Sequence, residues 1–245
     1  INALWAILAV GIIIFFTALP ISFYAAKYGL DMDLLTRGAS FGYIGSTISS
    51  FIYASFTFIL FALEAAIMAY ALELYFNLPL FLGYLVCALV IIPLVIHGVT
   101  FINRIQMFSQ PVWLILMCAP FIAILYQDPD VVSRMTLFAG ATGERGEFNL
   151  LLFGAATAVG VALIPQIGEQ VDFLRFMPEK THENRFRWNL GVLLAGPGWI
   201  IVGMIKMAAG VLLAYLVIQR DMSFLDAVNP THMYLVGYEY LFSSR

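Results

Sequence analysis

The sequence predicts an all-α, polytopic membrane helix bundle, and two observations carry this prediction. Hydrophobic residues make up 62% of the chain and charged residues only 11%, whereas about a quarter of the residues in soluble domains are charged. The apolar residues also gather in long runs, and a helix needs about 20 of them to cross a bilayer. The alternating pattern of a transmembrane β-barrel is absent from the sequence. We therefore expect an integral, multi-pass membrane protein in contact with a lipid bilayer.

Six apolar runs qualify as spans, at residues 4–26, 46–74, 79–98, 107–126, 149–169 and 190–219. Their orientation follows from the loops, because cytoplasmic loops retain Lys and Arg. The first, third and fifth loops hold Lys27, Arg37, Arg104, Arg175, Lys180, Arg185 and Arg187. The second and fourth loops and the segment after the last span hold Arg134, Arg145 and Arg220, before the terminal Arg245. The loops at 27–45, 98–106 and 170–189 are therefore predicted to be cytoplasmic.

The second span carries a carboxyl group near its middle. In "FILFALEAAIMAYAL" (58–72) every residue but Glu64 is apolar or small. An ionised side chain at the centre of a membrane helix costs about 2.5–3.5 kcal/mol on insertion scales, so such residues usually face a bundle interior or a water-filled cavity. Glu64 is thus a candidate for a substrate or proton site. The alternative is a structural carboxyl that is protonated or tied to a neighbouring helix.

The sixth span carries the opposite charge at a similar depth. Lys206 lies in "GMIKMAAGVLL", too far from either end of the run to reach the interface easily. An ion pair with Glu64 is the simplest arrangement. A structural pair and a functional lysine both fit this pattern.

The fifth span, "GAATAVGVALIPQIGEQVDFLRF", contains Gly160, Pro165 and Gly168 close to Gln166. Proline removes a backbone hydrogen bond, and glycine loosens the helix. In a membrane, freed backbone groups are tolerated only where protein buries them or where they line a cavity. Broken helices with polar residues at the break point to a transporter binding site. We expect an interruption between Gly160 and Gly168, and a simple proline kink is the alternative.

Other residue types argue against several classes of protein. Cys87 and Cys118 lie inside apolar runs and are expected to be small hydrophobic residues. The spacing of His, Cys and carboxylates suggests no metal site, and no phosphate loop or nucleophile motif is present, so we expect neither an enzyme nor a cofactor. The net charge of −3 and the lack of a basic patch give no support for nucleic-acid binding.

Two motifs resemble those of a known family. "LLTRGASFGYIGS" (34–46) and "DFLRF" (172–176) are similar to loop motifs of the nucleobase:cation symporter family, the purine and cytosine permeases. The resemblance implies a leucine-transporter-type fold with inverted repeats. Residues 1–245 would then be a partial permease-like transmembrane domain that corresponds to the family's second to seventh helices. The first helix and the eighth onward would be missing, and we expect this chain to be a piece of a longer protein.

The resemblance also assigns site residues. Glu64 aligns with a polar position that hydrogen-bonds the edge of the nucleobase, and the interruption at Gly160, Leu163 and Gln166 aligns with the family's discontinuous helix at the substrate site. The family carries tryptophans near these positions to stack on the base, whereas here Leu60 and Leu163 stand there. Lys206 stays a possible charge partner of Glu64.

The expected function is cation-coupled transport of a nucleobase or related small polar solute by alternating access, in a bacterial inner (plasma) membrane. The coupling cation would be sodium or a proton. An alternative stays open, because permease-like bundles also occur as sensory modules of histidine kinases. Such a module binds a solute and reports it to the rest of a larger signalling protein.

Overall fold

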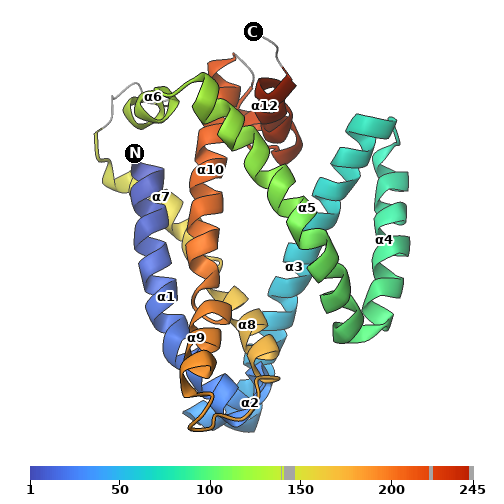
Figure 1. Cartoon of the computed structure of the whole chain (residues 1–245), viewed down its shortest axis with the longest axis vertical. Coiled ribbons are helices and arrows are strands. Elements are labelled where there is room, and N and C mark those ends of the chain that lie inside the picture. The colour runs from blue at the N-terminus through green and yellow to red at the C-terminus, as the bar shows by residue number, and fades with distance from the viewer. Residues whose placement is uncertain (139, 141–146, 221–222, 243–245) are drawn as a thin grey trace. The chain divides into compact units, whose positions relative to one another are not determined.

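The computed structural model of the chain describes residues 1–138, 140, 147–220 and 223–242. These residues form helices and connecting segments, and no β-strand occurs among them (Figure 1). The longer helices are α1 (Asn2–Tyr28), α3 (Gly42–Phe76), α4 (Leu80–Ile96), α5 (Gly98–Gln127), α7 (Leu150–Val161), α9 (Arg185–Ala195), α10 (Trp199–Gln219) and α12 (Pro230–Phe242). The shorter helices are α2 (Met32–Thr36), α6 (Val131–Leu137), α8 (Ile167–Leu174) and α11 (Phe224–Ala227). The all-α prediction is confirmed for the described residues.

Five helical segments of the described chain are long and apolar enough to cross a membrane. They cover Asn2–Tyr28, Met32–Phe76, Thr100–Gln127, Leu150–Leu174 and Arg185–Gln219, and each contains most of one predicted span. The span expected at 79–98 is the 17-residue helix α4, which is shorter than the usual 20 residues. It ends early because the chain turns at Gly98, whose φ of 78° lies in the left-handed region.

The chain divides into two compact units. The first comprises residues 1–58 and 139–208, and the second comprises residues 59–138 and 209–245. Helices α3 and α10 contribute residues to both units. The predicted interruption of the fifth span and the two motif segments lie in the first unit.

Helix α1 is the centre of the first unit and packs against α7, α8 and α9. Its buried face presents Val10, Ile14 and Ala18 to Ile167 and Ile200. Small residues allow close approach: a Cβ added at Gly160 would lie 3.0 Å from a methyl carbon of Val10. Burial of these aliphatic side chains and the close fit of α7 on α1 hold the unit together.

The motif segment "RGASFG" forms a bend between α2 and α3. Ser40 has φ of 77° and Gly42 has φ of 66°, so both lie in the left-handed region. Glycine adopts that region without strain, whereas serine does so at a cost. Arg37 stabilises the segment, because its Nε donates to Ser46 Oγ at 3.3 Å and its guanidinium pairs with Asp33 at 2.5 Å.

The second unit is built around α5, α12 and the part of α10 beyond residue 208. Its core contains Ile124, Leu213, Val217 and Val236, among other buried side chains. The hydroxyl of Tyr238 donates to the carbonyl of Leu116 at 2.6 Å and ties α12 to α5. Helix α12 lies after the last predicted span, and its 13 residues are too few to have been recognised as one.

Candidate functional site

The fifth predicted span is interrupted between α7 and α8. Helix α7 ends at Val161, a 3₁₀ turn covers Ile164–Gln166, and α8 begins at Ile167. Leu163 N donates to Gly160 O at 3.1 Å and Gln166 N donates to Leu163 O at 3.0 Å, so these bonds span three residues instead of four. α-Helical bonding is interrupted between Gly160 and Gly168, as predicted, but by a tight 3₁₀ turn and not by an unwound stretch; a proline kink and a binding-site break both fit this geometry.

Pro165 explains where the helix breaks. Proline has no N–H, so the carbonyl of Val161 loses the donor that an α-helix would place four residues later. The 3₁₀ turn tightens the chain past this gap, and normal helical bonding resumes in α8. The result is a local set of altered backbone bonds inside a segment that is long and apolar enough to cross a membrane.

Beyond the break, Asp172 on α8 joins three elements. Its Oδ2 accepts a hydrogen bond from the hydroxyl of Tyr53 on α3 at 3.2 Å, and its Oδ1 accepts one from the N–H of Met32, the first residue of α2, at 3.5 Å. Gly168 makes this arrangement possible, because a Cβ there would lie only 2.7 Å from the Tyr53 ring. We call Asp172, Tyr53 and Gly168 the α8 anchor.

Charged side chains surround the anchor on the same end of the unit. Arg175 on α8 pairs with Asp31 at 3.4 Å, which connects the fifth loop to the first. Lys180 Nζ lies 4.5 Å from the ring centroid of Trp188 and 5.1 Å from that of Phe23. The loops at 27–45 and 170–189 therefore lie together, as their common predicted side requires.

The opposite end of α1 is joined to the fourth loop. Asn2 Nδ2 donates to the carbonyl of Glu147 at 3.2 Å, and Asn2 Oδ1 accepts from Asn149 N at 2.9 Å. The first and fourth loops thus lie at opposite ends of α1. Which end faces the cytoplasm stays a prediction.

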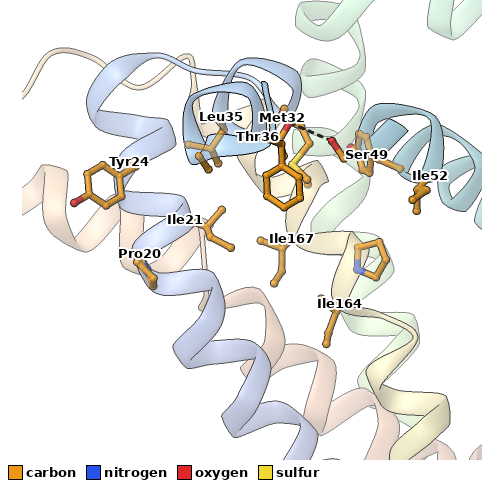
Figure 2. A pocket seen from close by; sticks show the side chains of 15 residues that line it. Pro20, Ile21, Tyr24, Met32, Leu35, Thr36, Ser49, Ile52, Ile164 and Ile167 are labelled. Carbon is orange, nitrogen blue, oxygen red and sulfur yellow. Dashed lines mark hydrogen bonds between the residues drawn. The ribbon is translucent and has the colours of Figure 1, made fainter. Parts of the chain in front are cut away.

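A pocket of about 490 Å³ lies between α1, the α2–α3 bend, α3 and the start of α8. We call it the α1–α8 pocket (Figure 2). Ile21, Leu35, Ile52, Ile164 and Ile167 contribute aliphatic side chains to its lining. Its volume falls within the range of about 300–1,000 Å³ that is usual for small-molecule pockets.

Three of the four hydroxyl-bearing side chains that line the α1–α8 pocket are already hydrogen-bonded to protein. Ser49 Oγ donates to Thr36 Oγ1 at 3.2 Å, and Thr36 Oγ1 donates to the carbonyl of Met32 at 3.0 Å. Tyr53 donates to Asp172 in the α8 anchor. Figure 2 shows the Tyr24 hydroxyl at the margin of the pocket, pointing away from Ile21 and Ile167. The interior is therefore suited to an apolar group.

The residues predicted to bind solute belong to two units. Gly160, Leu163 and Gln166 lie at the break in the first unit, where Gly160 is buried against α1 and the other two are half-buried. Lys206 lies in the same unit on α10, with an exposed side chain. Glu64, exposed, and Leu60, half-buried, are on the part of α3 that belongs to the second unit. A shared solute site and a Glu64–Lys206 pair stay predictions.

Sequence reasoning missed the α8 anchor. Asp172 was recognised only as part of a motif, and Tyr53 lies 119 residues earlier in an apolar span. A usable signal was present, since a carboxylate just after a broken span needs hydrogen-bond donors and Tyr can supply one from within an apolar helix.

The described part of the chain contains no group of three or more His, Cys, Asp or Glu residues that could hold a metal ion. Cys87 and Cys118 are both free thiols, and Cys87 is buried. Comparison of this chain with protein-family models, with curated proteins and with solved structures finds no match.

Proposed function

We propose that this chain is part of a secondary active transporter that carries a nucleobase or a related small polar solute, coupled to sodium or a proton. The observation that supports this proposal is the interruption of helical bonding between α7 and α8 in a segment that is long and apolar enough to cross a membrane. Altered backbone bonds at membrane depth are tolerated where they line a cavity. Discontinuous helices of this kind hold the substrate in many transporters.

In this proposal the solute lies at the break. The carboxylate of Glu64 accepts hydrogen bonds from ring N–H and amine groups of the solute. Gln166 supplies both a donor and an acceptor, and Leu60 and Leu163 cover the faces of the ring. The α1–α8 pocket fits this solute poorly, because its lining is mainly apolar and the hydroxyl groups of Thr36, Ser49 and Tyr53 are already hydrogen-bonded to protein.

The experiment measures binding and uptake of a panel of radiolabelled nucleobases by the protein in liposomes. The test variant is Glu64→Gln, and the matched control is Glu73→Gln, which changes an exposed glutamate on the same helix. A hydrogen bond to a charged group contributes about 1.5–3 kcal/mol, so affinity should fall about tenfold or more in Glu64→Gln only. Unchanged affinity in Glu64→Gln would remove Glu64 from the site.

A structural role of Glu64 predicts a different pattern. Loss of its charge would then destabilise the protein, and Lys206→Met in the same chain would restore the stability. Thermal unfolding of the single and double variants distinguishes the two roles. Binding without uptake would favour the solute-sensing module over the carrier, and absence of binding to any nucleobase by folded protein would contradict the proposal.

A further inference from the structure

We propose that the α1–α8 pocket binds an acyl chain of an anionic phospholipid whose phosphate is held at Lys27. The first support is the chemistry of the pocket. Its lining side chains are mainly aliphatic. The hydroxyl groups of Thr36, Ser49 and Tyr53 donate their hydrogen bonds to other groups of the protein. A polar solute would lose its hydrogen bonds to water there without replacement. A hydrocarbon chain loses none.

The second support is what the pocket opens onto. Pro20, Tyr24 and Ile52 line it and are themselves exposed. They belong to Asn2–Tyr28 and Met32–Phe76, two of the segments that are long and apolar enough to cross a membrane. The medium around such segments is the hydrocarbon core of the bilayer, so acyl chains are the molecules that reach this opening.

The third support is the surface that leads from the pocket to the end of α1. Pro20, Tyr24, Lys27 and Tyr28 are spaced four, three and one residues apart, which puts them on one face of the helix. The rings of Tyr24 and Tyr28 stack with centroids 6.1 Å apart, and Lys27 Nζ lies 4.9 Å from the Tyr28 centroid. Tyrosine with Lys or Arg marks the level of lipid headgroups.

Charges near Lys27 favour a phosphate over a neutral headgroup. The two nearby carboxylates, Asp31 and Asp33, are each paired with an arginine, which offsets their repulsion of an anion. The first loop is predicted to be cytoplasmic, and that leaflet carries the anionic lipids of the membrane.

The test uses photoreactive phospholipids that carry a diazirine in the acyl chain. The protein is placed in nanodiscs with either a phosphatidylglycerol or a phosphatidylcholine probe, and crosslinked peptides are quantified by mass spectrometry. A second apolar pocket of about 550 Å³, lined by Trp5, Leu8 and Phe153 at the other end of α1, is the internal control. We expect the phosphatidylglycerol probe to label the α1–α8 pocket about fivefold more strongly than the phosphatidylcholine probe does. One basic residue near a membrane surface provides a preference of about this size.

Two variants test the binding of the acyl chain and the binding of the headgroup separately. Ile52→Trp fills the α1–α8 pocket and should abolish labelling there. Ile12→Trp fills the control pocket and should leave labelling at the α1–α8 pocket unchanged. Lys27→Gln should leave the labelling of the α1–α8 pocket in place but remove its preference for phosphatidylglycerol. The matched control Arg187→Gln, at another exposed basic residue, should leave both the labelling and the preference unchanged. The Lys27→Gln measurement does not depend on how well Ile52→Trp folds.

Three results would overturn the proposal. One is labelling at the α1–α8 pocket no stronger than at the control pocket. Another is a phosphatidylglycerol preference that survives Lys27→Gln. The third is another molecule in the pocket, either a non-lipid compound that blocks labelling of the purified protein or a protein segment crosslinked to Ile52→Cys.

Discussion

Substitution of Gly168 by alanine tests the α8 anchor at its tightest point. The added Cβ would lie 2.7 Å from Cε2 and 2.9 Å from Cδ2 of Tyr53. Ordinary carbon–carbon contacts lie at about 3.5–4.0 Å, so the ring or α8 must move by roughly 1 Å. That shift would break the 3.2 Å hydrogen bond from Tyr53 to Asp172.

The expected loss of stability has two parts. Overpacking of a close contact costs about 1–3 kcal/mol. A hydrogen bond to a charged group contributes about 1.5–3 kcal/mol, and the lower end applies here because Tyr53 and Asp172 are half-buried. Because alanine also favours a helix over glycine by about 1 kcal/mol, Gly168→Ala should lower the free energy of unfolding by about 1.5–3.5 kcal/mol in all. Tyr53→Phe removes only the hydroxyl and should cost about 1–2 kcal/mol.

The assay is equilibrium unfolding in mixed detergent micelles, applied to both single variants and to the double variant. The clash persists in the double variant, whereas the hydrogen bond is lost only once. The double variant should therefore be destabilised by less than the sum of the single ones, by about the energy of that bond.

Gly154→Ala is the matched control, because a Cβ at this position in α7 meets no atom within 4 Å. It should be neutral or slightly stabilising, since alanine favours a helix over glycine by about 1 kcal/mol. The reasoning is refuted if Gly168→Ala is as stable as Gly154→Ala, or if it adds fully to Tyr53→Phe.

Two further predictions concern topology and pH. In sealed cells, a cysteine at Lys180 should resist a membrane-impermeant thiol reagent and a cysteine at Ser133 should react, because the fifth loop is predicted to be cytoplasmic and the fourth is not; the reverse labelling would invert the orientation. At the α11–α12 junction, hydrogen bonds from Ser223 and then His232 lower the pKa of Asp226 below its usual value. The stability from this carboxylate should be complete above its unfolded pKa of about 3.9 and lost as the pH falls through its lower folded pKa. Amide hydrogen exchange of α11, corrected for the intrinsic pH dependence of exchange, measures this loss of stability. The loss should occur in the parent chain and in the control variant Asp130→Asn, but not in Asp226→Asn. Identical pH profiles in all three proteins would exclude the Asp226 carboxylate as the cause of the loss.

The long apolar helices were largely predictable, because the apolar runs in the sequence have the length that the hydrocarbon thickness of a bilayer requires. The interruption at 162–166 was predictable too, since Pro165 cannot donate and Gly160 and Gly168 lie on either side of it. Helices α2 and α12 were not predicted, because a five-residue and a 13-residue helix carry no distinctive signal in hydropathy. The partners within the α8 anchor were not predicted for a different reason: Asp172 signals a need for donors, but only the folded chain shows that Tyr53, 119 residues earlier, supplies one.

Tyr53 connects the two features of the first unit that lie beside the break. Its ring lines the α1–α8 pocket and covers Gly168, while its hydroxyl bonds to Asp172. Helix α8 follows the 3₁₀ turn at Ile164–Gln166, where altered bonding makes a change of direction least costly. A molecule that occupies the pocket must contact the same ring that anchors α8. A lipid bound there would therefore stabilise the anchored arrangement of α8 only if it binds that arrangement more tightly than one in which the Tyr53–Asp172 bond is broken, and the Tyr53→Phe variant measures that difference.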